Sequence, residues 1–192
     1  MSIVLQGSTS GSVTLQEPAV AGTTVLDLPA VSGTLITTAS SGQSIPKAAL
    51  PTGSVLQVVN ATYSTTTSTT SGSFVDTGLT ATITPLFSTS KILVIVNQAG
   101  NYKPSGNTYE QLRLVRNSTA IINMESLALY PNNIIAFGGN TISTTYLDSP
   151  ATTSATTYKT QFNSGDSSST VTVQVNNGFT ATSTITLMEI AA

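Results

Sequence analysis

The sequence contains no cysteine and no histidine. Without cysteine there can be no disulfide, and the two absences together exclude Cys₂His₂ and Cys₄ zinc sites and an imidazole base. A nucleophilic serine or threonine would therefore need lysine or a carboxylate as its base. We expect a protein that is not an enzyme and that holds no metal or cofactor.

Charged residues are also scarce, at 7% of the chain against roughly 25% in an ordinary soluble domain. Six basic and eight acidic residues give a net charge of −2, so no basic stripe exists for phosphates, and we expect no nucleic-acid binding. No apolar run approaches the roughly 18 residues of a transmembrane helix. The first residues lack the features of a secretory signal, so we expect synthesis in the cytoplasm without membrane insertion.

Serine and threonine are abundant and make up about a third of the residues. Threonine packs like valine on a pleated surface while its hydroxyl binds water, so this composition favours strands over helices. Leu79, Ala81 and Ile83 alternate with threonines, which is the pattern of a half-buried strand. About ten such short candidates between Ser54 and Ile190 indicate an antiparallel sandwich or barrel.

Two segments are more apolar, Ile92–Val96 and Ile185–Ile190. Both are predicted to be central strands covered on both faces. The segment Tyr109–Met124 could be a helix, but its leucines alternate with polar residues, so a strand is favoured. The polar tract Tyr63–Ser73 shows no periodicity and is predicted to be an exposed loop.

Residues 1–53 differ from residues 54–192 and are predicted to be an extended, β-rich attachment and oligomerisation arm before a single β-sandwich domain. The arm contains the pattern LxxPAVxG twice, at Leu15–Gly22 and Leu26–Gly33. Such a unit cannot bury its own apolar residues, so a partner must order it, although a solenoid repeat and a plain linker are alternatives. The residues expected to make this attachment are Leu15, Pro18, Val20, Leu26, Pro29 and Val31.

Few other residues are candidates for a site. The eight carboxylates form no local pair of the kind that glycoside hydrolysis needs, and Asp76 and Asp148 are expected to cap backbone in turns. Tyr102, Tyr109 and Tyr130 lie in or beside segments rich in Asn, Ser and Gly, a composition suited to binding carbohydrate or protein. The alternative is that these tyrosines cover edges of the core.

Several segments resemble the C-terminal domains of phage fibre and virion-surface proteins. These are Phe74–Pro85, Ser90–Val94, Tyr146–Pro150, Tyr158–Gln161 and Ile185–Ile190, and the LxxPAVxG units followed by Gly33-Thr-Leu35 are similar to phage fibre segments. Such domains resemble the C1q/TNF-like jelly roll, which trimerises through one sheet face. The resemblance therefore implies a homotrimeric, antiparallel jelly-roll sandwich.

Only about 50 residues precede the sandwich, whereas long tail fibres carry a docking domain and a shaft. The resemblance thus points to a short head fibre or capsid decoration protein on the virion, with the major capsid protein or another virion protein as partner. The alternative is a tail-fibre or receptor-binding knob that recognises a host-surface glycan or protein.

Overall fold

The computed structural model describes residues 3–6, 8–15, 50–104, 107–129, 136–138, 141–167, 169–176, 178 and 180–192. The chain divides into two units, Met1–Ser44 and Ile45–Ala192, and each is described by itself. In the described ranges all regular elements are strands, and no helix is long and apolar enough to cross a membrane. The prediction of an all-β protein is confirmed.

The first unit contains a short antiparallel hairpin. Its strands are β1 (Ile3–Gln6) and β2 (Ser12–Leu15), with Ile3 opposite Leu15. Gly11, just before β2, has a φ of 78°, a left-handed conformation that glycine adopts without steric cost. Among the predicted attachment residues, Leu15 is the last residue of β2. The others lie outside the described residues: Pro18, Val20, Leu26, Pro29 and Val31.

The described residues of the second unit form three four-stranded antiparallel sheets. The first sheet has the order β11 (Ile142–Asp148), β6 (Lys91–Gln98), β14 (Ser183–Ile190), β3 (Val55–Tyr63). The second sheet has the order β5 (Val75–Ile83), β12 (Thr156–Ser164), β8 (Glu110–Arg116), β9 (Thr119–Ala128). The third sheet has the order β10 (Ala136–Gly138), β7 (Asn101–Lys103), β13 (Val171–Val173), β4 (Thr67–Thr69).

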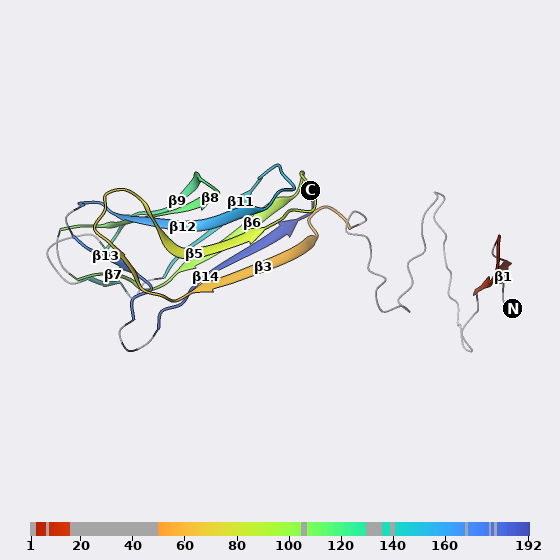
Figure 1. Ribbon diagram of the computed structural model, residues 1–192, viewed down its shortest axis with the longest axis horizontal. Coiled ribbons are helices and arrows are strands. Elements are labelled where there is room, and N and C mark those ends of the chain that lie inside the picture. The colour runs from red at the N-terminus through yellow and green to blue at the C-terminus, as the bar shows by residue number, and fades with distance from the viewer. Residues whose placement is uncertain are drawn as a thin grey trace, which may run out of the picture. The chain divides into compact units, whose positions relative to one another are not determined.

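The first two sheets form a jelly roll. Counted along the chain from β3, their eight long strands stand in the orders 1-8-3-6 and 2-7-4-5, the arrangement of two interlocked Greek keys. Figure 1 shows β12, β8 and β9 in one layer and β3, β14 and β6 in the other. The predicted antiparallel jelly-roll sandwich is confirmed.

The core lies between these two layers because alternate residues of each strand point inward. In β5 the inward residues are Leu79, Ala81 and Ile83, as the alternation predicts. The other buried members of this cluster are Ile92, Val94, Val96, Leu114, Tyr158, Ile185 and Leu187.

The third sheet covers a second, smaller core cluster. This cluster joins Val171 and Val173 of β13 to Leu112 of β8 and Phe162 of β12. The prediction that the tract Tyr63–Ser73 is an exposed loop is wrong in part, because this tract contains β4, which pairs with β13. The threonines of β4 have high strand propensity, and a neighbouring strand supplied by the fold was enough to order them.

Among the described residues of this unit, the prediction that Ile92–Val96 is covered on both faces is wrong. Residues of β6 alternate between buried and half-buried, so Leu93 and Ile95 face outward. The same holds for β14, where Met188 and Ile190 are half-buried. The physical reason is that the first sheet packs its inner face on the core, while no further described layer covers its outer face.

The strand interpretation of Tyr109–Met124 is confirmed by the β8–β9 hairpin. Asn117 turns the chain at a φ of 53°, a left-handed conformation that asparagine tolerates well. Its side-chain Oδ1 accepts a hydrogen bond from the amide of Thr157, which ties the hairpin to β12. The hairpin places Arg113 and Arg116 beside β12.

Candidate functional site

The outer face of the first sheet carries a continuous row of apolar side chains. The strand registers place Leu147 opposite Leu93, Leu93 opposite Met188, and Met188 opposite Val58. These four residues, one from each strand, are called the apolar row. Leu147 and Val58 are 55% and 54% exposed, while Leu93 and Met188 are half-buried.

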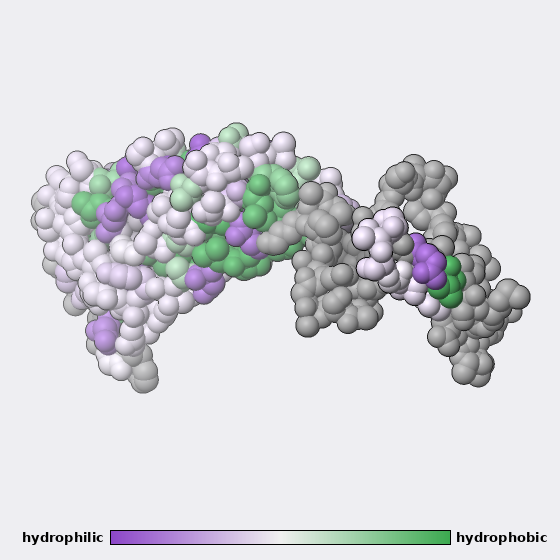
Figure 2. Space-filling view, turned by 45° about the vertical axis from the view of Figure 1, so that its right-hand side comes forward, coloured by the Kyte–Doolittle hydropathy of each residue, from purple (hydrophilic) through white to green (hydrophobic). Residues whose placement is uncertain are grey.

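The apolar surface continues beyond the row. Ile190 lies opposite Val55, which is also exposed, and Ile95 faces the same side of β6 as Leu93. In Figure 2 hydrophobic residues gather on the half of this unit where β3 begins and β14 ends. Exposed side chains of this size in contiguous positions are typical of a surface that another molecule covers.

The rest of this outer face is polar but almost free of charge. Asn60 donates to Thr186 Oγ1 at 2.8 Å, and Ser143 donates to Asn97 Oδ1 at 2.7 Å. Lys91, the first residue of β6, is the one charged residue among the described outward residues of this sheet, and its Nζ donates to Ser149 Oγ at 2.8 Å. These polar groups therefore bond to one another and leave a surface with a single charged side chain, Lys91.

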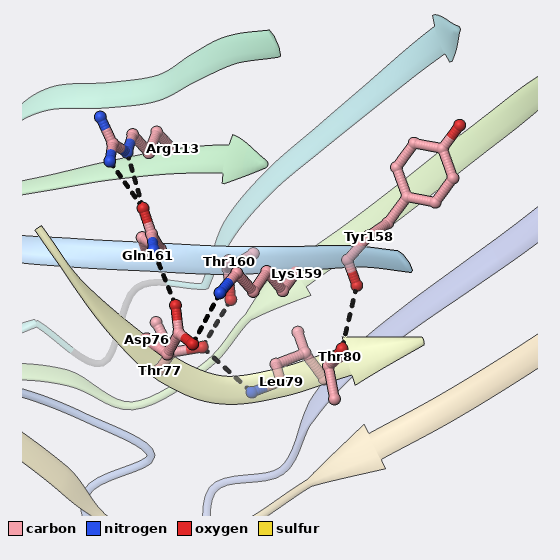
Figure 3. Close-up of polar contacts among 9 residues, drawn as sticks. All are labelled: Asp76, Thr77, Leu79, Thr80, Arg113, Tyr158, Lys159, Thr160 and Gln161. Carbon is pink, nitrogen blue, oxygen red and sulfur yellow. Dashed lines mark hydrogen bonds and ion pairs between the residues drawn. The ribbon is translucent and has the colours of Figure 1, made fainter. Parts of the chain in front are cut away.

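The outer face of the second sheet is different because it carries a network of charged groups. Lys159 Nζ donates to Asp76 Oδ2 at 2.8 Å, and Gln161 Nε2 donates to Asp76 Oδ1 at 2.7 Å. Figure 3 shows the Asp76 carboxylate between these two side chains, with Arg113 donating to Gln161 from the far side. Partial burial raises the pKa of Asp76, but the bonds from Lys159 and Gln161 outweigh it and hold this pKa below its usual value.

The expectation that Asp76 and Asp148 cap backbone in turns is wrong. Asp76 lies within β5, and its side chain bonds to side chains of β12. Asp148 is the last residue of β11. Its carboxylate accepts hydrogen bonds from Arg116 Nη1 at 2.8 Å and from the Tyr158 hydroxyl at 2.6 Å. Burial, together with this bond to Asp148, raises the pKa of the Tyr158 hydroxyl well above its usual value. Both carboxylates have structural partners that are remote in the sequence.

Two further carboxylates are buried. Glu189 is buried at the end of β14; the burial raises its pKa, but bonds from the Gln57 side chain and the backbone amides of Leu86 and Phe87 bring the pKa below its usual value. Glu110 is also buried, yet neither of its carboxylate oxygens has a partner among the described residues. Burial therefore raises the pKa of Glu110 well above its usual value.

The predicted tyrosines occupy different places. Tyr102 lies in the middle of the third sheet, opposite Phe137 of β10 and Thr172 of β13, and is half-buried. Tyr109 directly precedes β8, and its half-buried ring packs so closely on Gly165 that no Cβ would fit there. Tyr130 lies outside the described residues.

The described residues contain no group of three or more acidic side chains placed to hold a metal ion. The apolar row is the feature that sequence reasoning missed. Its signal was present in the unbroken run Ile92–Val96, but the partners on β11, β14 and β3 depend on strand order and register.

No family model matches the chain, and no curated protein matches it. Among solved structures, the chain is similar to the VP2 subviral particle of infectious bursal disease virus, with 13% identity and a TM-score of 0.38 over 71% of this chain and 38% of that chain. It is also similar to structures of the Gx and Gt strains of that virus. The Gx strain gives 11% identity and a TM-score of 0.33, covering 72% of this chain and 43% of that chain. The Gt strain gives 11% identity and a TM-score of 0.31, covering 99% and 47%. The chain spans less than half the length of each of these three chains.

Proposed function

We propose that the protein is a bacteriophage virion structural protein, a short trimeric head fibre or capsid decoration protein attached through its N-terminal arm. The observation that carries this proposal is the apolar row on a nearly uncharged sheet face. The jelly roll alone does not select the function, because lectins and cupins share it with viral capsid proteins. Covering a nearly uncharged, apolar sheet face with a copy of the same protein lowers the free energy, because apolar surface is removed from water.

In the proposed homotrimer the first sheets of three copies face one another around a three-fold axis. The lack of charge helps because identical charged faces would repel each other. Leu147 is 55% exposed, so roughly 100 Å² of its apolar surface remains to be buried, which gives about 2.5 kcal/mol per copy at ~25 cal/mol/Å². Leu93, Met188 and Val58 would add smaller amounts.

Paired substitutions test the assembly face. Leu147→Asp places a charge in the apolar row and is expected to convert the oligomer to monomer in sedimentation velocity. Leu127→Asp is the matched control, because Leu127 is 57% exposed but lies on β9 of the second sheet. Equal effects of the two substitutions, or an oligomer that survives Leu147→Asp, would rule out this face.

The arm is proposed to dock on the major capsid protein or another virion protein by burying Leu15, Val20, Leu26 and Val31, with Pro18 and Pro29 ending the strands. Deleting residues 1–50 should leave a soluble knob that no longer attaches to particles. Immunogold electron microscopy of virions locates the protein on head or tail. A truncated form that still decorates virions contradicts attachment through the arm.

A receptor-binding or tail-fibre knob is the second candidate function, favoured by the pocket beside Asp76 and Lys159 on the second sheet. We propose no enzymatic activity for either role. The absence of histidine and cysteine from the sequence supports this, as do the structural partners of Asp76 and Asp148. Host polysaccharide incubated with the protein should keep its chain length, and shortening would reveal a depolymerase.

A further inference from the structure

A pocket of about 380 Å³ opens on the outer face of β5 and β12. Its volume lies within the roughly 300–1,000 Å³ of small-molecule sites. The pocket occurs where the pairing of β5 with β12 shifts register, between Lys159 and Gln161. Gly78 has a φ of 93° there, and the Tyr63 ring fills the place of a Cβ, so the bulge requires glycine. The lining residues are Asp76, Gly78, Leu79, Thr80, Thr157 and Lys159.

The rim of the pocket offers a hydrogen-bond acceptor beside a donor. Asp76 Oδ2 and Lys159 Nζ are 2.8 Å apart, and their side chains are 52% and 26% exposed. Each carboxylate oxygen can accept a second hydrogen bond, and the ammonium has two N–H groups besides the one that Asp76 accepts. A ligand can therefore bind both groups without breaking the ion pair.

The Asp76 carboxylate is held in position before any ligand arrives. Gln161 Nε2 donates to its second oxygen, and Gln161 Oε1 accepts from Arg113 Nε at 2.9 Å and Nη2 at 2.7 Å. The Arg113 guanidinium in turn lies 3.9 Å from the centroid of the Phe74 ring. Figure 3 shows this chain of contacts running across three strands from Arg113 to Lys159. Preorganisation of this kind lowers the entropy cost of binding.

Neighbouring hydroxyls on a sugar ring match this arrangement. One hydroxyl can donate to Asp76 while the next accepts from Lys159, because their oxygens are separated by a distance comparable to that of the ion pair. Thr80, Thr157 and Lys159 also line the pocket, and side chains of these types carry methyl or methylene groups against which the C–H groups of the ring can pack.

We propose that this pocket binds a neutral saccharide through a vicinal diol held by Asp76 and Lys159. The site lies on the sheet opposite the apolar row, so it stays accessible in the proposed trimer. This inference deepens the receptor-binding candidate by naming its ligand class and residues. It does not depend on the proposed trimer or on the proposed role of the arm. If either of those proposals is wrong, sedimentation or the virion-attachment experiment will show it, and not the sugar titration.

The test is a titration of full-length, ¹⁵N-labelled protein monitored by amide chemical shifts. The probes are methyl α-mannopyranoside, methyl β-galactopyranoside and methyl α-glucopyranoside, which together present cis and trans diols. Each is added to about 100 mM, because a single sugar in a shallow site binds in the millimolar range. At least one should give saturable shifts at Gly78 and Thr80, whereas cyclohexanol, which has no diol, should not.

Three variants locate the binding. Asp76→Ala and Lys159→Met should each weaken it at least tenfold with the remaining amide shifts unchanged, and either variant suffices if the other does not fold. Asp166→Ala, which removes an exposed carboxylate that does not line the pocket, should bind like the unaltered protein. The proposal is overturned if no glycoside gives saturable shifts, if cyclohexanol binds equally well, or if the folded pocket variants keep the original affinity.

Discussion

Glu110 should make the stability of the protein fall as the pH rises towards neutral. Its carboxyl is fully buried at the start of β8, and neither oxygen has a partner among the described residues. Burial raises the pKa of this group well above its usual value, because the ionised form loses its hydration. The folded chain therefore holds the proton more tightly than the unfolded chain.

The sign and size of the effect follow from this difference in proton binding. An unfolded glutamate has a pKa of about 4.3, and below that pH both states carry the proton, so the stabilisation is fully present. Between that value and the raised folded pKa, the free energy of unfolding falls by up to about 1.4 kcal/mol per pH unit. In a chain of this size, that corresponds to a fall in Tm of roughly 3–5 °C per pH unit.

Calorimetric melting between pH 5 and 7 measures this slope. Asp76 and Glu189 have lowered pKa values, so the stability that they contribute is lost only at more acidic pH, outside this window. Glu110→Gln should flatten the profile, and Glu125→Gln, which removes a half-buried carboxylate on β9, serves as the matched control. If Glu110→Gln melts with the same pH slope as the unaltered protein, Glu110 is not the group responsible.

Two other outcomes follow from the polar and apolar contacts. The oligomer should keep its mass between low and molar salt in sedimentation, because its proposed interface is apolar and nearly uncharged, and dissociation at high salt would contradict that interface. Asp148→Ala should lower the free energy of unfolding by about 2–3 kcal/mol in urea titrations, because it leaves Arg116 and the Tyr158 hydroxyl without their carboxylate. Asp166→Ala, on an exposed turn, should change that free energy by less than about 0.5 kcal/mol, and equal losses would show that the buried contact has no special role.

The individual strands could be predicted because each one carries its own signal. Leu79, Ala81 and Ile83 alternate with threonines, and the structure buries the first set and exposes the second. The same alternation favoured a strand over a helix for β8, and Leu112 and Leu114 both face the core as a strand requires. Period-two patterning is decided by which face is buried, so it is visible without knowledge of the partners.

The candidate surfaces could not be predicted because they join residues that only the strand order brings together. Leu147 and Val58 lie on opposite edge strands, and the row between them exists only in the observed register. Arg116 reaches Asp148 across 32 residues of sequence. The apolar run at Ile92–Val96 did indicate a second covered face, and within one chain that face lacks a described cover.

Sedimentation equilibrium of the full-length protein at micromolar concentration tests the central claim most directly. The proposed assembly through the apolar row predicts a mass three times the chain mass of 19.7 kDa, unchanged by salt. A protein that sediments as a monomer at that concentration, with the apolar row left in water, would contradict the account.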